Sequence, residues 1–329
     1  MRSIFGVLPY MIAAALSAGA ADGPPGWAYG FPPDATPAAN PAGVPGGGGG
    51  RGPRAPADAS LKHLDGSKLE FTRAQINDGF GPADWFPEDH PQMPEIVAHG
   101  RRPGVRACAL CHYPNGKGRA ENAGVSGLSV AYFIQQMIDF KDGNRKSADP
   151  RKSNTNAMAS IAKAMTDEEI KAAAEYFGSI PFTPWIKVVE TTTVPKTRIS
   201  GGLFLVLEGG EQEPLGQRII EVPESEEMTE TLRNPRSGFF AYAPVGSVKK
   251  GEALAASGQC GLCHGADLKG IGPVPAIAGR SPSYLMRQMY DMRQSTRKGL
   301  WTGLMTPVVA HLSEEELMDL AAYTASRTP

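Results

Sequence analysis

The residues of this chain best suited to chemistry are its four cysteines and the histidines beside them. They form two copies of a C-x-x-C-H motif: Cys108, Cys111 and His112 in the first, and Cys260, Cys263 and His264 in the second. At this spacing each pair of thiols can form thioethers with the two vinyl groups of one haem, and the adjoining imidazole can reach the iron. The motifs therefore predict two covalently bound haem c groups, with His112 and His264 as iron ligands.

Two other kinds of site use cysteines at this spacing. A zinc site needs two more ligands at finger-like spacing, and the flanking sequence offers none. A dithiol redox pair favours a βαβ pattern, whereas the flanks here are predicted to be helix and loop. The duplication, the lack of any further cysteine and a predicted export signal favour haem over both alternatives.

The N-terminus has the pattern of a secretory signal over residues 1–20. Arg2 precedes a largely apolar run from Ile4 to Leu16, and Ala18-Gly19-Ala20 forms a small-residue cleavage site. An uncleaved anchor is the alternative, but the apolar run is short for a membrane span. The pattern predicts a mature protein in the periplasm, without stable membrane insertion.

The charge balance limits the classes of partner expected, and the composition predicts one unstructured segment. Lysine and arginine number 33 and aspartate and glutamate 34, and no basic patch interrupts this balance, so a nucleic-acid partner is not expected. Residues 21–59 are rich in proline, glycine and alanine and include the run Gly46–Gly50. This composition predicts a flexible tether.

An internal repeat follows the tether. At the 152-residue offset that relates the two motifs, identical residues recur in pairs: Lys117 and Lys269, Gly127 and Gly279, Tyr132 and Tyr284, Gln136 and Gln288, Met137 and Met289, Asp139 and Asp291, Arg145 and Arg297. Self-similarity of this kind indicates a shared fold. We expect a first haem domain over residues 60–183, with an N-terminal extension, and a second over 247–329.

Each repeat predicts two helices after its motif. The first begins near Ser129 or Ser281, and the last begins at a capping box, Thr166–Glu169 or Ser313–Glu316. Between the repeats, residues 184–246 predict a small β-containing linker. Its expected strands lie in three stretches: Trp185–Val194, Leu203–Leu207 and Ile219–Val222.

A sixth iron ligand is expected from one methionine in each repeat. Met158 and Met305 occupy matching positions just ahead of the two capping boxes, where we expect a loop. A thioether is the common soft ligand in electron carriers. Met165, which aligns with Leu312, is the nearest rival, and core packing is the alternative role for any methionine. His63, His90 and His99 precede the first motif and are expected at the surface.

The order of motif, helix, distal methionine and acid-capped last helix resembles class I cytochrome c, here as a tandem di-haem pair. The resemblance implies a mainly α fold with two haem domains joined by the β-containing linker. It also implies that the Pro275 carbonyl accepts a hydrogen bond from His264 and so orients its imidazole. The equivalent of Pro275 in the first repeat is Ala123, which leaves the partner of His112 open.

Iron with both axial positions filled favours one-electron transfer over substrate chemistry. The expected partners are a dehydrogenase donor and, as acceptor, a terminal oxidase or another cytochrome. Two alternatives stay open. The chain could be the cytochrome subunit of a membrane-associated dehydrogenase, or a di-haem redox enzyme with one open iron.

Covalent attachment is tested by extraction with acidified acetone. Because thioethers survive this treatment, we expect the colour to stay with the protein. Replacing Cys260 and Cys263 by alanine should leave one haem per chain. Colour in the acetone layer would contradict the prediction.

The export signal is tested by the intact mass of the native protein. We expect a chain that begins near Ala21, recovered in the soluble periplasmic fraction. A chain that retains Met1, found in the membrane fraction, would support the uncleaved anchor instead.

Overall fold

The computed structural model describes residues 23–32 and 59–329. Its α-helices are α1 (Gly26–Tyr29), α2 (Arg73–Ile76), α3 (Glu95–Ala98), α4 (Cys108–His112), α5 (Val130–Lys141), α6 (Ser153–Ala164), α7 (Asp167–Ser179), α8 (Ser247–Ser257), α9 (Cys260–His264), α10 (Pro282–Arg293), α11 (Thr302–Val309) and α12 (Glu314–Ser326). Two further short helices are η1 (Pro87–Asp89) and η2 (Glu227–Thr231). The strands are β1 (Leu61–His63), β2 (Glu70–Thr72), β3 (Ile186–Glu190), β4 (Thr193–Pro195), β5 (Thr197–Ser200), β6 (Leu203–Val206), β7 (Gln212–Pro214), β8 (Ile220–Pro223) and β9 (Phe239–Ala243).

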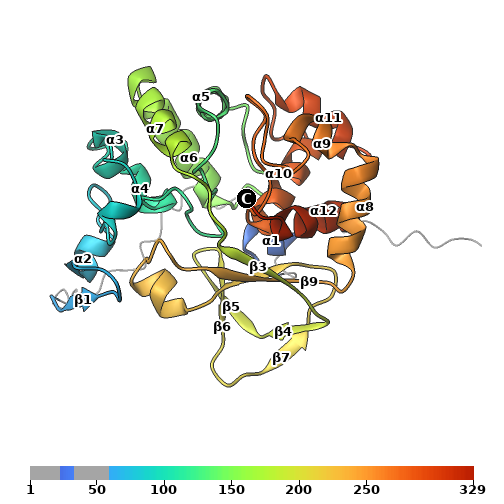
Figure 1. Ribbon diagram of the computed structural model, residues 1–329, viewed down its shortest axis with the longest axis horizontal. Helices are drawn as coiled ribbons and strands as arrows, with labels where there is room; N and C mark the ends of the chain where they lie inside the picture. Colours follow the sequence, from blue (N-terminus) through green and yellow to red (C-terminus); the bar gives the residue numbers. More distant parts are fainter. Residues whose placement is uncertain (1–22, 33–58) are drawn as a thin grey trace, which may run out of the picture.

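Two helical units stand side by side on a layer of β-strands (Figure 1). The first unit contains α3 to α7, the second contains α8 to α12, and the strands β3 to β9 lie beneath them. The fold is therefore mainly α with a β insert, as the sequence predicts. Within the described ranges, no helix has both the length and the apolar character needed to cross a membrane. The predicted signal, residues 1–20, lies outside these ranges.

The helix starts predicted from capping residues are confirmed. The Ser129 side chain accepts a hydrogen bond from the Tyr132 amide at the start of α5, and Ser281 does the same for Tyr284 at the start of α10. Complete capping boxes begin α7 and α12, formed by Thr166 with Glu169 and by Ser313 with Glu316. Because these residues satisfy amides that have no partner inside the helix, they define where each helix begins.

The three predicted strand stretches of residues 184–246 are also confirmed, as β3 with β4, β6 and β8, and the structure adds β5, β7 and β9. The central sheet has the order β3-β9-β8, in which β3 pairs with β9 in parallel and β8 pairs with β9 antiparallel. Two-stranded ladders, β4 with β7 and β5 with β6, complete the layer. Most of its buried residues share one core with α10, α11 and α12, while Leu203, Leu205 and Phe239 pack in a smaller core with Trp185 and Ala120. The segment therefore forms part of the second unit's core as well as connecting the two repeats.

The prediction of a flexible tether is wrong for residues 23–32. Trp27, Ala28 and Tyr29 in α1 are buried in the core shared by the β layer and the second helical unit. The Tyr29 hydroxyl donates to Asp291 Oδ1 at 2.7 Å. Two large aromatic side chains supply the buried apolar area that the surrounding glycine and proline lack. Residues 33–58 of the predicted tether lie outside the described part of the chain.

Removing the Tyr29 hydroxyl should weaken this docking. Asp291 is buried and also accepts from the Ala148 amide, so Tyr29→Phe leaves a buried carboxylate with one donor fewer. We expect the free energy of unfolding, measured by urea denaturation, to fall by about 1–3 kcal/mol. Tyr323→Phe, at a half-buried position on α12, is the control and should change it by less than about 0.5 kcal/mol. Equal effects would show that the Tyr29–Asp291 bond does not hold α1 in place.

Candidate functional site

Both C-x-x-C-H motifs fold as single helical turns. Cys108–His112 forms α4 and Cys260–His264 forms α9. In a helix, residues three positions apart lie on one face. Each turn therefore presents its two thiols together, with the histidine directly after them. None of the four cysteines forms a disulfide, so all four are available for thioether bonds to a haem.

A backbone carbonyl fixes each imidazole. His264 Nδ1 lies 2.8 Å from Pro275 O, the contact that the resemblance implied. His112 Nδ1 lies 2.8 Å from Ala123 O, which supplies the partner that the sequence left open. Because a carbonyl oxygen can only accept, Nδ1 carries the proton in both rings, and the lone pair of Nε2 is free to bind a metal.

The surroundings of these groups favour uncharged forms. Burial lowers the pKa of His112 and of His264, so both imidazoles are neutral at pH 7, the form that binds iron. Burial also raises the pKa of the Cys108 thiol to about 12 and that of the Cys111 thiol above its ordinary value. This burial favours an uncharged sulfur, such as that of a thioether.

Met158 and Met305 lie in helices, so the prediction that they sit in loops is wrong. Met158 is inside α6 and Met305 inside α11, and each helix directly precedes the last helix of its repeat. The Ala-rich sequence of residues 153–164 favours helix over loop. Met158 is half-buried and packs at the edge of the core cluster that also borders Cys108. Met305 is half-buried at the edge of the core below the second unit.

Met165 and His90, two of the rival ligands, are engaged in other contacts, whereas His63 and His99 are exposed as expected. Met165 is 4% exposed inside the core of the first unit, as expected of a packing residue. The His90 side chain is also buried, contrary to the expected surface position. Its Nε2 contacts Asp84 Oδ1 at 3.1 Å and its Nδ1 contacts Pro91 O at 2.9 Å. Both ring nitrogens of His90 therefore face oxygen atoms.

The two helical units meet at a reciprocal set of hydrogen bonds. Arg145 donates to Gln136 of its own repeat and, at 3.1 Å and 2.9 Å, to Tyr284 Oη and Gln288 Oε1 of the other. Arg297 donates to Gln288 of its own repeat and, at 2.9 Å each, to Tyr132 Oη and Gln136 Oε1. These are the residue pairs that match at the 152-residue offset. The repeat is therefore a pseudo-twofold arrangement about this interface.

The two interface arginines form no ion pair with a carboxylate of the described residues, and Asp291 stabilises the charge of Arg297 only at longer range. Among residues 23–32 and 59–329, the side-chain hydrogen bonds of Arg145 and Arg297 go to neutral oxygens. Arg297 is 4% exposed, and its Nε has no hydrogen-bond partner. A buried cation is stabilised by an anionic partner. The carboxylate groups of a haem have the charge that this orphaned donor fits.

Both haem-motif regions resemble known cytochrome domains. A family model described as cytochrome c matches residues 97–181. A model described as cytochrome c oxidase, cbb3-type, subunit III matches residues 246–323. The first match includes α4 to α7, and the second includes α8 to α11 and most of α12.

Similar proteins are cytochromes and an electron acceptor. A protein named thiosulfate dehydrogenase electron acceptor, from Stutzerimonas stutzeri, is 26% identical over 231 residues, 69% of this chain and 82% of that protein. Cytochrome c-554(548) of Halomonas halodenitrificans is 41% identical over 71 residues, 21% of this chain and 86% of the relative. Cytochrome c4 of Pseudomonas aeruginosa is 43% identical over 85 residues, 25% of this chain and 39% of its own length.

One solved structure aligned with this chain is that of reduced recombinant cytochrome c4 from Pseudomonas stutzeri. The alignment has 20% sequence identity and a TM-score of 0.43, and it covers 67% of this chain and 93% of that one.

Replacing Arg145 and Arg297 together should allow the two helical units to unfold separately. In Arg145→Gln/Arg297→Gln, buried tyrosine and glutamine groups lose their donors, at a cost of about 1–3 kcal/mol for each unpaired group. We expect calorimetry to resolve two unfolding transitions where the unchanged protein shows one. Lys146→Gln, which removes the exposed cation next to Arg145, should leave a single transition. A single transition in the double variant would show that the other contacts between the units, such as those of Arg280 with Gly124 O and Ser126 O, are enough to couple them.

Proposed function

Because this chain belongs to the cytochrome c family, with two covalently bound haem c groups, we propose that it relays single electrons between redox proteins of the periplasm. The donor is a dehydrogenase-type protein, and the acceptor is a terminal oxidase or another cytochrome. When bound, each haem supplies an Fe(III)/Fe(II) couple.

The observation that carries the proposal is the matched pair of oriented imidazoles. His112 and His264 each direct Nδ1 to a carbonyl oxygen 2.8 Å away, 11 positions further along the chain. This bond holds the ring in one tautomer and one orientation. Residues with the same role at both sites favour two sites of the same kind, which suits a relay.

We assign the residues of each site as follows. Cys108 and Cys111, and Cys260 and Cys263, hold the two haems, while the Pro275 and Ala123 carbonyls position the proximal histidines. Met158 and Met305 are the distal ligands. With a histidine and a methionine held at each haem, the bound group would supply a one-electron couple and no open position for substrate.

The names of the relatives support a dehydrogenase as donor. Besides the electron acceptor of Stutzerimonas stutzeri, a protein named cytochrome subunit of sulfide dehydrogenase, from Chlorobaculum tepidum, is 36% identical over 74 residues. That second name favours one alternative, in which this chain is a bound subunit of a dehydrogenase complex. Co-purification of a flavin or other dehydrogenase subunit with the native protein would favour the complex, and isolation of the chain alone would favour the relay.

The ligand assignment is tested by removing each thioether while conserving volume. Met158→Leu and Met305→Leu should each lose part of the weak absorption band at the red end of the ferric spectrum. Each should also open one iron to carbon monoxide and lower that haem's potential. The control variants Met165→Leu and Met289→Leu should keep the absorption band, the poor binding of carbon monoxide and the haem potentials. The unchanged protein should bind carbon monoxide poorly at both haems.

Ready binding of carbon monoxide by the unchanged, reduced protein would contradict this assignment. One iron would then be open, and a di-haem redox enzyme would be the better description. Unchanged spectra in Met158→Leu or Met305→Leu would assign that distal ligand to another residue.

A further inference from the structure

The two haem-attachment motifs differ in exposure at equivalent positions. In the second motif, Leu262 is 73% exposed and Cys263 is exposed. Their counterparts in the first motif, Leu110 and Cys111, are half-buried. The difference continues beyond the histidines, because Tyr113, Pro114 and Asn115 are buried, whereas Ala266 and Asp267 are exposed and Gly265 is half-buried.

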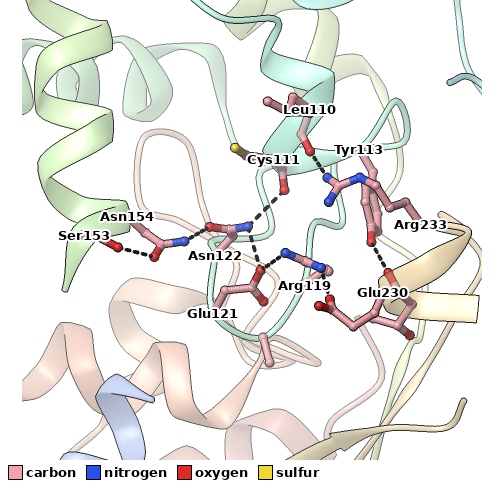
Figure 2. Close-up of polar contacts among 12 residues, drawn as sticks. Leu110, Cys111, Tyr113, Arg119, Glu121, Asn122, Ser153, Asn154, Glu230 and Arg233 are labelled. Carbon is pink, nitrogen blue, oxygen red and sulfur yellow. Dashed lines mark hydrogen bonds and ion pairs between the residues drawn. The ribbon is translucent and has the colours of Figure 1, made fainter. Parts of the chain in front are cut away.

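Residues 227–236, which we call the cover segment, account for this difference. The segment comprises η2 and the turn after it, and Figure 2 shows it beside α4. The Arg233 guanidinium donates to Leu110 O and lies 5.3 Å from the centre of the Tyr113 ring. The Tyr113 hydroxyl donates to Thr229 O at 3.4 Å. The backbone of the first motif and the side chain after its histidine are thus both held from the linker.

Two further contacts extend the cover along the loop after the motif. Arg119 pairs with Glu230 of the cover segment and, at 2.6 Å, with Glu121 of its own loop (Figure 2). The side-chain amide of Asn115 donates through Nδ2 to Pro235 O at 2.7 Å. The side chains of Arg119 and Glu121 are only 15% and 1% exposed, so water screens this pairing little.

The outer side of the cover segment is anchored to the N-terminal extension. Trp85 Nε1 donates to Leu232 O at 2.6 Å, and both residues are buried in one small core. Arg236 forms two 2.6 Å hydrogen bonds with the Asp89 carboxylate, and its guanidinium lies 3.5 Å from the centre of the Phe86 ring. The cover is therefore fixed on both sides, between the extension and the first motif.

We propose that the cover segment closes the first haem to protein-sized redox partners, so that electrons enter and leave the chain through the second haem. This inference rests on the relay function proposed above. Thioethers join each motif to vinyl groups on the rim of a haem, so a covered motif means a covered haem edge. An external donor gives one electron to the ferric second haem, which becomes ferrous, and the first haem exchanges that electron with the second.

The proposal is tested with two single-haem chains and two reductants. Cys260→Ala/Cys263→Ala keeps the first haem, and Cys108→Ala/Cys111→Ala keeps the second. The protein-sized donor is zinc-substituted cytochrome c, whose photoexcited state gives up one electron and leaves a zinc porphyrin cation radical. The small donor is dithionite. We expect the zinc protein to reduce the first haem at least about tenfold more slowly than the second, while dithionite reduces both at rates within about threefold.

The role of the cover segment itself is tested in the first-haem chain and in the native di-haem chain. Arg233→Ala/Glu230→Ala removes three contacts with the first repeat, whereas the control Lys196→Ala removes a partly exposed cation of the β layer that pairs with Glu211, outside the cover segment. The double variant should gain about tenfold in its reaction with the zinc protein, and the control should not. In the di-haem chain, the double variant should add a direct phase of reduction that the unchanged protein lacks.

The outcomes separate this inference from the relay function. Equal rates with the zinc protein for the two single-haem chains would overturn the inference and leave the relay function intact. So would a double variant that reacts like the control in the di-haem chain. Failure of dithionite to reduce either haem would overturn the relay function itself.

Discussion

The relative position of the two haem units depends on two arginines, the half-buried Arg145 and the buried Arg297. Arg145 and Arg297 each donate to a glutamine of their own repeat and to a tyrosine and a glutamine of the other. The backbones also pair at this point, where Arg145 and Arg297 form an antiparallel bridge. Since a guanidinium is rigid and planar, it fixes the directions of the groups that accept from it. Small shifts between the units would leave several buried polar groups unpaired, which makes a single docked arrangement favourable.

The β layer, α1 and Arg280 add to the hydrogen bonds of Arg145 and Arg297 in holding the two units together. The β layer shares its core with α10, α11 and α12, and α1 packs into the same core. From the other unit, the carbonyl oxygens of Gly124 and Ser126 accept from the buried Arg280, at 2.8 Å and 2.9 Å. The layer, the second unit and the loop beside His112 are thus held as one body. An electron relay benefits from such rigidity, because a fixed separation of the two haems fixes the rate of transfer between them.

The sequence predicts the features that depend on local patterns. Capping residues such as Ser129 and Ser313 mark helix starts, and the motif spacing identifies the haem sites, because these signals act within one or two helical turns. The Ala123 carbonyl could also have been predicted from the 152-residue offset, since a backbone oxygen serves whether or not the residue is proline. Four alanines in residues 153–164 favour the helix around Met158, so local propensity could have predicted it. The helix around Met305 contains Gly303 and Pro307, which disfavour a helix, so no local signal predicts it.

Contacts between distant parts of the chain could not be predicted from local sequence patterns. Tyr29 and Asp291 are separated by 262 positions and Trp85 and Leu232 by 147, and no local pattern relates them. The helix α1 lies within a stretch of sequence rich in glycine and proline, and its burial depends on a surface formed by the β layer and α10 to α12. The same holds for the buried His90 side chain, whose ring lies 6.1 Å from the ring of Tyr176, 86 positions further along the chain.

Tyr113 shows that the two copies of the repeat have diverged in structure. Its φ of 62° and ψ of 159° match the 84° and 153° of its counterpart Gly265, in a region that is open to glycine and strained for any other residue by about 1–3 kcal/mol. The strain is borne in the first copy alone, where the ring is 4% exposed and lies against Arg233. The two copies have therefore ceased to be interchangeable. A chimera built from two second copies would keep both haem motifs and lose the tyrosine on which the linker rests.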